Sequence, residues 1–485
     1  MASSFHGLEV GKRALFAQQT ALSTTGHNIA NANSAGYTRQ RAEMRASSAM
    51  SVSAGIYSFQ IGTGVEISKM QRMREDYLDV QIRSENKNLG YWEAKSDSLS
   101  KIEEILNEPS DEGIAYVMNE FWKGWQELAK DPDSAAARAV VRQRGVAVTE
   151  SFKSIMDSLD QMQTDLKHVI NTKTEEVNSL ATQIANLNDQ IGRLVANNYD
   201  PNDLYDQRDL LVDLLSKVVD VKVTNSVHGK VDISVGGELL VEGNTAKELT
   251  FEYDSTSGLV DPNTISIGDK KITLVSGELL GRFEAYGLVN GGSESTVPYI
   301  KGKINDYAMT IVKAINDAHM EGENLDNINN GTTTKYTFFT GTSAQDLDVN
   351  QKILDSLDYI AAAQKDPLTG IASTGNGDNA KVIADLLLTK NLDFSGTTST
   401  VNDFYRNVIG QLGIDSQEAA RMRENSQGIV EQVENRRQSI SGVSLDEEMT
   451  NMIKFQQAYN AAARMVSVMD ECLDKVINGM GRVGL

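Results

Sequence analysis

The strongest constraint in this sequence is a long array of apolar residues whose spacings alternate between four and three. The array runs Ile155, Leu159, Met162, Leu166, Val169, Val177, Leu180, Ile184, Leu187, Ile191 and Leu194, and it contains one step of eight residues after Val169. Such spacing places one narrow apolar face along a helix that packs against other helices. The step of eight predicts a one-residue skip, with a local adjustment of the supercoil. We therefore expect a very long helix that begins near Ser134.

Both ends of the chain carry a similar narrow stripe. Leu8, Leu15, Leu22 and Ile29 recur every seven residues within a helix predicted over 1–32. A second helix is predicted after Ser444, a candidate N-cap that forms a capping box with Glu447. The stripe of this helix comprises Leu445, Met449, Met452, Tyr459, Val466, Leu473 and Val476. Stripes this narrow suit a coiled coil better than a globular core.

The charges of the two ends are complementary. Residues 1–45 carry five basic and two acidic side chains, whereas residues 445–485 carry four basic and six acidic ones. The sequence thus predicts that the terminal helices pair with each other or with copies in neighbouring subunits. The alternative is that each helix packs on a globular domain of its own.

A turn rich in asparagine and glycine follows the first helix. Asn and Gly readily adopt the left-handed conformations that end helices. Asn28, Asn31, Asn33, Gly36 and Tyr37 are therefore predicted to shape the exit from this helix, and Gly36 is expected to hold a positive φ.

The rest of the chain predicts mainly helix with inserted β modules, an α+β fold class. Helices are expected over 77–107, 115–130, 202–217, 299–319 and 401–440. An extended segment or hairpin is expected over 46–70, strands with glycine turns over 218–285, and mixed structure over 320–400. The string Asp203–Asp209 predicts a polar network on its helix rather than an active site.

Composition excludes several classes of function. Of 485 residues, 46 are Lys or Arg and 67 are Asp or Glu, so the net charge of −21 opposes binding of nucleic acid or of an anionic membrane. No apolar run reaches 18 residues, and the first ten residues lack the pattern of a cleaved secretory signal. Cys472 is the only cysteine, which excludes disulfides and multi-cysteine metal sites. We expect no enzyme, no metal and no cofactor.

Three segments resemble one protein family. Gly26–Tyr37, together with the first heptads, resembles the N-terminal motif of the flagellar axial proteins, although Ser34-Ala35 replaces the usual Thr-Pro. The C-terminal stretch Ser441–Met449, which continues through Phe455–Tyr459 and Ala462–Arg464, resembles the FlgK-type family of hook–filament junction proteins. Asn202–Asp209 with Leu210–Leu215, and also Gly322–Leu325, resemble internal segments of that family.

The resemblance implies a domain organisation and an extracellular place in the flagellum. It implies a ring of subunits between hook and filament, in which the two stripes form the assembly interface. Residues 1–45 with 441–485 would form an inner coiled-coil domain, and 46–217 with 299–320 and 401–440 a helical rod domain. Residues 218–298 would form a β-rich module and 321–400 a mixed, loop-rich outer module.

The same resemblance implies partners and a route of export. The partners would be copies of the chain itself, the hook protein, a FlgL-type second junction protein and a cytoplasmic FlgN-type chaperone bound to the last helix. Export would use the flagellar type-III apparatus, which takes unfolded chains without a cleaved signal. Before assembly, the terminal helices would be disordered in the monomer.

Two alternatives remain open at this stage. The nearest is a hook or rod protein of the same axial class. The other, from a different class, is a secreted surface binding module or enzyme located in 218–400, where we find no catalytic constellation.

Overall fold

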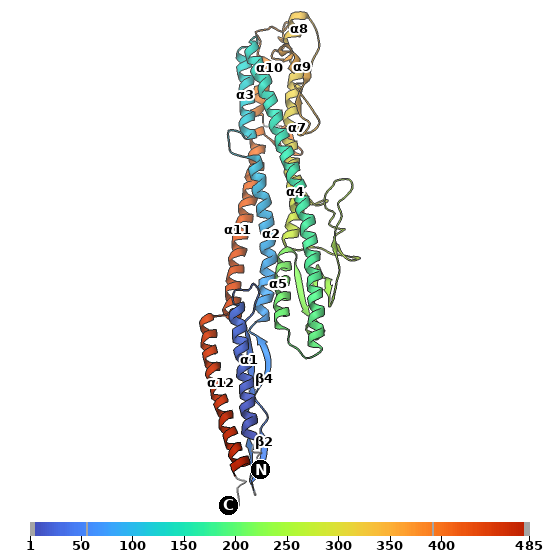
Figure 1. The fold of residues 1–485 in the computed structure, drawn as a ribbon. Helices are drawn as coiled ribbons and strands as arrows, with labels where there is room; N and C mark the ends of the chain where they lie inside the picture. The colour runs from blue at the N-terminus through green and yellow to red at the C-terminus, as the bar shows by residue number, and fades with distance from the viewer. Residues whose placement is uncertain (1–4, 55–56, 390–391, 480–485) are drawn as a thin grey trace, which may run out of the picture.

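The chain folds into an elongated molecule in which long helices run side by side (Figure 1). The structure is a computed structural model that describes residues 5–54, 57–389 and 392–479. Helices dominate and the strands form small antiparallel sheets, so the predicted α+β class is confirmed. The first and last long helices of the chain lie at one end of the molecule, and the short helices between residues 325 and 385 lie at the other (Figure 1).

The long helices form the terminal end and the body. The two terminal helices are α1 (His6–Asn31) and α12 (Leu445–Asp474), the latter followed by a π-helical turn over Lys475–Gly479. The body contains α2 (Asp76–Leu106), α3 (Ile114–Lys130), α4 (Ala135–Val195), α5 (Asn202–Val218), α6 (Glu278–Tyr286), α7 (Thr296–Glu321) and α11 (Val401–Ser441). At the distal end lie α8 (Leu325–Asn330), α9 (Gln351–Asp355) and α10 (Asp378–Asp385).

The helix α4 carries the array that the sequence analysis began from. It spans 61 residues, which is about 92 Å at 1.5 Å per residue, and Ser134 caps it by accepting a hydrogen bond from the amide of Ala137. The predicted one-residue skip is wrong in detail. The buried face passes through Ile170 and Thr174 instead of Val169, which gives consecutive steps of four between Leu166 and Thr174. Two adjacent steps of four are a stutter, which locally unwinds a supercoil.

One hydrophobic core runs through the body. It contains residues of α2 to α7, of the β module and of α11, and its densest part is an aromatic cluster at the distal end. Trp122 and Trp125 are fully buried there beside Phe121 and Phe338, so these two tryptophans pack in the core. Trp92 is only partly buried at the edge of the core.

The strands predicted between 218 and 285 are present. A four-stranded sheet has the order β5 (Val221–Asn225), β6 (Val231–Val235), β7 (Glu238–Glu242) and β8 (Thr245–Ala246). A smaller sheet pairs β9 (Leu249–Thr250), β10 (Ser266–Ile267) and β11 (Lys270–Lys271). The helix α6 lies inside the range 218–298 that the sequence assigned to β structure. Gly277 and Gly287 bracket it with φ angles of 102° and 123°, and its buried Leu279 and Phe283 pack into the body.

A two-stranded ribbon follows α1, where an extended segment or hairpin is expected over 46–70. β1 (Gln40–Ala46) pairs with β4 (Val65–Arg72), and β2 (Met50–Ala54) pairs with β3 (Tyr57–Ile61). The ribbon lies along α1, where Gly64 touches Val10 and the ring of His6 contacts the carbonyl of Gly62. The predicted division into domains places 46–72 in the rod; that division stays a prediction.

The distal end is held together by a buried histidine. His319 lies at the end of α7, and its ring contacts Phe338, which directly precedes the hairpin of β12 (Phe339–Thr340) with β13 (Asp348–Val349). The hairpin of β14 (Leu392–Phe394) with β15 (Thr397–Ser399) lies earlier along α7, where Thr310 donates to the Asp393 carbonyl. Nε2 of His319 accepts the amide of Ala361 at 2.9 Å, so its proton is on Nδ1, which donates to the carbonyl of Tyr336 at 2.7 Å. Burial lowers the pKa of His319 to about 4, and the charge of Arg138 adds to this.

We predict that the distal end loses stability in acid. The unfolded chain takes up a proton on this histidine near pH 6.5, whereas the folded state does so only near pH 4, so stability falls as pH drops through this interval. The loss between pH 7.5 and pH 5 is about 2 kcal/mol. Tryptophan fluorescence during urea unfolding measures it, because Trp125 touches the His319 ring. The variant His319→Gln should show a clearly smaller acid shift; an equal shift would contradict this assignment.

Candidate assembly interface

The terminal helices α1 and α12 lie antiparallel, side by side (Figure 1). Small residues form the contact between them. A Cβ atom placed on Gly11 would lie 2.7 Å from Cγ2 of Val466, and one placed on Gly7 would lie 2.7 Å from Cε of Met469. The buried residues of α1 are likewise small or polar: Gly11, Ala17, Ala21, Thr24, Thr25 and Asn28. The two helices therefore approach closely and bury little apolar surface.

The predicted stripes are only partly engaged in this contact. Of their residues, Val466 of α12 lies against Gly11. At 100° per residue, Leu15 and Leu22 project roughly 100–120° from the mean direction of the buried residues of α1. Leu8, Leu15, Leu22 and Ile29 are only partly buried, as are Met452, Tyr459, Val466 and Leu473 on α12. Leu445, Met449 and Val476 are exposed within one chain, and the role of both stripes in assembly stays a prediction.

A buried polar cluster fixes the upper end of this helix pair. The Asn28 amide group donates to the Gln40 carbonyl at 2.9 Å and to Glu448 Oε2 at 3.0 Å. Asn28 Oδ1 accepts the Gln40 amide at 3.0 Å and the Tyr37 hydroxyl at 2.8 Å. Arg39 completes the cluster by donating through Nε to Glu448 Oε1 at 2.8 Å. We call Asn28, Tyr37, Arg39, Gln40 and Glu448 the register cluster.

The register cluster determines how α12 is aligned on α1. The Glu448 side chain is 3% exposed; its charge is compensated by Arg39, and its Oε2 accepts a hydrogen bond from the Asn28 amide group. Sliding α12 by one heptad would leave this carboxylate buried away from its partners, which is strongly destabilising. Burial, followed by the carboxylates of Asp203, Asp206 and Glu448, raises the pKa of the Tyr37 hydroxyl, so it stays a hydrogen-bond donor.

The turn after α1 is placed by its glycine and asparagines. Gly36 has a φ of 75°, which confirms the predicted positive φ, and a Cβ atom there would lie 3.1 Å from Leu210 of α5. Asn31 is partly buried and accepts the Ser34 hydroxyl at 3.3 Å, and Asn33 is exposed. Of the five predicted turn residues, the structure brings Asn28 and Tyr37 together in the register cluster.

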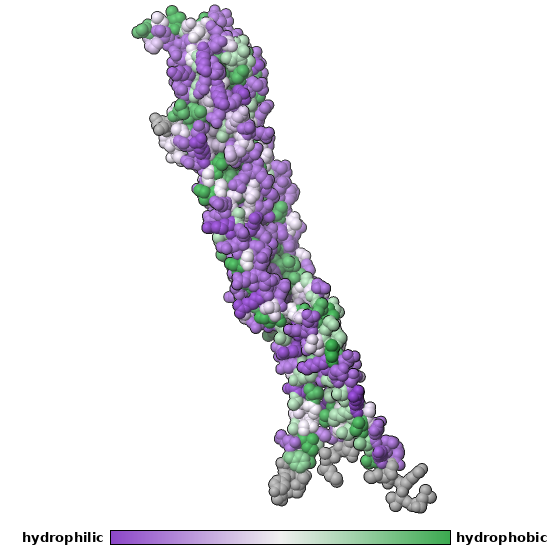
Figure 2. Space-filling view, turned by 90° about the vertical axis from the view of Figure 1, so that its left-hand side faces the viewer, coloured by the Kyte–Doolittle hydropathy of each residue, from purple (hydrophilic) through white to green (hydrophobic). Residues whose placement is uncertain are grey.

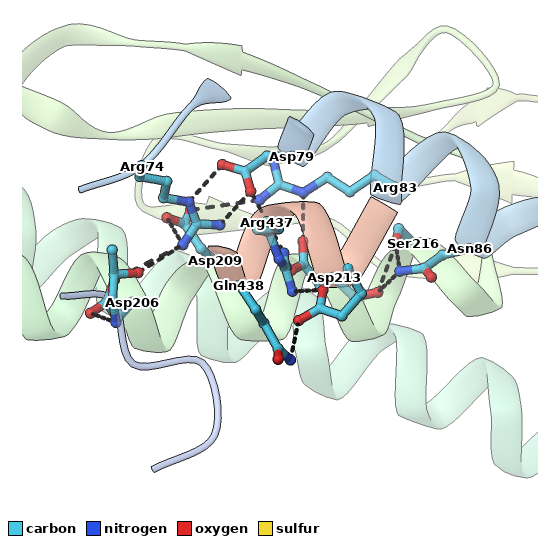
Figure 3. A network of polar contacts seen from close by, with 12 residues as sticks. Arg74, Asp79, Arg83, Asn86, Asp206, Asp209, Asp213, Ser216, Arg437 and Gln438 are labelled. Carbon is cyan, nitrogen blue, oxygen red and sulfur yellow. Dashed lines mark hydrogen bonds and ion pairs between the residues drawn. The ribbon is translucent and has the colours of Figure 1, made fainter. Parts of the chain in front are cut away.

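The acidic helix α5 connects the terminal pair to the body (Figure 3). Asp206 accepts the Thr38 amide at 2.9 Å and the Arg72 guanidinium at 2.9 Å. Asp209 faces Arg72 and Arg74 at 2.9 and 3.4 Å. Asp213 binds Arg83 of α2 and Arg437 of α11, while Asp79 binds Arg74. The string Asp203–Asp209 is thus part of a polar network, as predicted.

The surroundings shift the pKa of Asp209 and the pKa of Asp206 in opposite directions. Burial by itself would raise the pKa of Asp209, but the surrounding guanidinium groups of Arg74, Arg72, Arg208 and Arg83 outweigh it and lower the pKa. For Asp206, burial prevails and raises the pKa despite its bonds to Thr38 and Arg72. Through its contacts with Thr38, Arg72, Arg83 and Arg437, α5 holds the turn, the ribbon, α2 and α11 in fixed positions.

Sequence reasoning missed most of this network. It selected Asn28, Tyr37 and the string Asp203–Asp209, but not Glu448, Arg39, Arg74 or Arg437 as their partners. Glu448 is 420 residues from Asn28 and 409 from Arg39, and Arg437 is 224 residues from Asp213, so spacing gave no signal.

The described part of the chain offers no alternative chemistry at this site. No cluster of three His, Cys, Asp or Glu in it could hold a metal ion. Cys472 is exposed on α12. No helix over 5–54, 57–389 or 392–479 combines the length and apolarity needed to cross a bilayer.

Three family models match the chain in order. The model of the "Flagella basal body rod protein" matches 8–38, and that of the "Flagellar basal body rod FlgEFG protein C-terminal" matches 435–479. Between them, the model of the "Flagellar hook-associated protein FlgK helical domain" matches 99–338. The matched ends include most of α1, all of α12, and Asn28, Tyr37 and Glu448 of the register cluster.

Relatives match over nearly the whole chain. Flagellar hook-associated protein 1 of Bacillus subtilis is 41% identical, with 99% of each chain covered. The protein of the same name from Salmonella typhimurium is 28% identical, covering 96% of this chain and 98% of the relative. A solved structure, the flagellar hook junction protein FlgK from Burkholderia pseudomallei, superposes with a TM-score of 0.61 at 14% identity, covering 74% of this chain and all of that one.

The fold and these matches define the class: this is a structural protein of the bacterial flagellum. Within that class, the chain belongs to the family of flagellar hook-associated protein 1, the FlgK family.

We predict that Glu448→Ala separates α1 from α12. The change leaves Arg39 and Asn28 without their buried partner and should cost about 3 kcal/mol. Hydrogen exchange over 6–31 and 445–474 should accelerate in both helices together. Glu447→Ala is the matched control, because Glu447 pairs with the same Arg39 but its side chain is 63% exposed, so its loss should cost under about 1 kcal/mol. Equal effects of the two changes would contradict the register cluster.

We also predict that Gly36→Val opens the turn. Valine is strained at positive φ by roughly 1–2 kcal/mol and its side chain would meet Leu210. Limited proteolysis should cut the variant faster within 32–40. Gly26→Val is the control, since no atom lies within 4 Å of a Cβ at Gly26. A Gly36→Val protein as resistant as the Gly26→Val protein would show that the turn tolerates a side chain.

Proposed function

We propose that this chain is a junction subunit that assembles as a ring between hook and filament through its terminal helices. The observation that carries the proposal is the lack of a core in the terminal pair. Among the described residues, no side chain of α1 or α12 belongs to either hydrophobic cluster of the protein. Such a pair gains stability when neighbouring copies cover its apolar faces.

The exposed apolar faces support the proposal that copies of the same chain cover the terminal pair. On α12, Leu445, Met449 and Ile453 are spaced four residues apart, and all three are exposed. Apolar residues gather at the terminal end, whereas the surface of the body is mainly hydrophilic (Figure 2). The partly buried leucines of α1 offer a second strip. Contiguous apolar surface of this kind is typical of interfaces.

The structure of the body supports the proposal that the rod is already folded before assembly. Its core is continuous from α2 to α11, so it needs no neighbour for stability. We propose the division given by the sequence: an inner domain of 1–45 with 441–485, a rod, a β-rich module over 218–298 and an outer module over 321–400. The network on α5 would then fix the position of the inner domain relative to the rod.

The names of the relatives support the place of the ring. They are hook-associated proteins and, for the solved structure, a hook junction protein. The hook protein on one side and a FlgL-type protein on the other would then be neighbours. Export through the flagellar type-III apparatus and a FlgN-type chaperone on α12 belong to the same proposal. A hook or rod subunit is disfavoured because the matched central domain is that of FlgK.

The test places a charge on the proposed interface. In a motile bacterium that lacks its own copy, Met449→Asp or Leu22→Asp should abolish filament formation, because a buried carboxylate cannot be paired between copies. Electron microscopy counts hooks that carry filaments. The matched control is Ile414→Asp on α11, since Ile414 is 59% exposed and Met449 58%.

Normal filaments with Ile414→Asp and bare hooks with Met449→Asp would support assembly through the terminal pair. Normal filaments with both Met449→Asp and Leu22→Asp would overturn it.

A further inference from the structure

The helix α12 is unusually rich in methionine for its length. It carries Met449, Met452, Met465 and Met469 within 30 residues, out of 16 methionines in the whole chain. Methionines of the body such as Met118, Met156 and Met162 are instead buried in the core. Met449 of α12 is 58% exposed, against 40% for Met50 and 39% for Met320, so its thioether is the most open to reagents among the described methionines.

The four methionines occupy two kinds of position. Met449 lies between Leu445 and Ile453 in the exposed row of α12, and Met465 is also exposed. Met469 touches Gly7 of α1 with Sδ and Cε, so its sulfur lies in the contact between the helices. Met452 is partly buried. Thioethers thus occur both on the outward face and within the pair.

Oxidation would change the chemistry of this surface. A peroxide transfers one oxygen atom to the thioether sulfur: the O–O bond breaks, the S=O bond forms, sulfur loses two electrons and the second oxygen leaves as water. The product is a polar, chiral sulfoxide in place of a flexible apolar side chain, which disrupts methionine-rich interfaces. Sulfoxide reductases reverse the change with two electrons from a dithiol, which becomes a disulfide, and the oxygen leaves as water.

We propose that Met449 and Met465 are modification sites at which peroxides reversibly block docking of the terminal pair onto neighbouring subunits. This inference rests on the proposed assembly through α1 and α12. A sulfoxide at Met449 would put a strong hydrogen-bond acceptor into the row formed with Leu445 and Ile453. The side chains of Leu445 and Ile453 beside it offer no hydrogen-bond donor, so docking loses free energy.

The first measurement maps oxidation on the purified monomer. Treatment with dilute hydrogen peroxide followed by peptide mass spectrometry should add one oxygen to Met449 and Met465 roughly ten times faster than to Met118 or Met156, because susceptibility follows exposure. Equal rates at Met449 and at the buried methionines would overturn the proposal at this step.

The second measurement asks whether oxidation prevents docking. Untreated and oxidised monomers are sedimented with hooks isolated from cells that lack this chain. Untreated protein should bind, oxidised protein should lose at least about tenfold in binding, and sulfoxide reductase should restore it. Failure of the untreated protein to bind would count against the proposed function, and thus separates that outcome from failure of the oxidation proposal.

The matched variants identify the sites. The double variant Met449→Leu/Met465→Leu keeps an apolar side chain of similar volume and should still bind after peroxide treatment. Met320→Leu is the control, because Met320 of α7 is 39% exposed and Met465 is 38% exposed. If the oxidised double variant bound hooks no better than the oxidised Met320→Leu protein, methionines other than Met449 and Met465 would cause the loss of binding.

Discussion

The terminal helix pair is held in register by a buried carboxylate and has no hydrophobic core of its own, and the rest of the architecture follows from this. Small residues let α1 and α12 approach closely, and Leu445, Met449 and Ile453 of α12 stay exposed. On the proposed function, this apolar surface is covered by neighbouring copies, and the pair is half of an interface.

The polar networks give this weakly buried unit a defined position. The register cluster aligns α12 on α1, and the carboxylates of α5 hold the turn, the ribbon, α2 and α11 (Figure 3). Buried ion pairs contribute little net stability but penalise wrong arrangements strongly. These ion pairs therefore determine the orientation of the terminal helices rather than add to the stability of the fold. A subunit that must present its terminal helices at one angle to a long body needs that property.

The sequence predicted the long helices, the start of α4 near Ser134, the positive φ of Gly36 and the polar role of Asp203–Asp209. It failed for α6, which is a short helix between glycines in a β-rich context. It also placed Leu445 and Met449 in a contact with α1, where small residues lie instead. Heptad spacing identifies an apolar face but not its partner, and Glu448 with Arg39 depends on a contact across more than 400 residues.

Hydrogen exchange read separately for α1, α4 and α12, on the monomer and on the assembled junction, tests the account most directly. The account predicts that α1 and α12 exchange at a common rate in the monomer, far faster than the core of α4, and that both become protected on assembly. Protection of both terminal helices in the monomer equal to that of α4 would contradict it, because the pair would then be stable without neighbours.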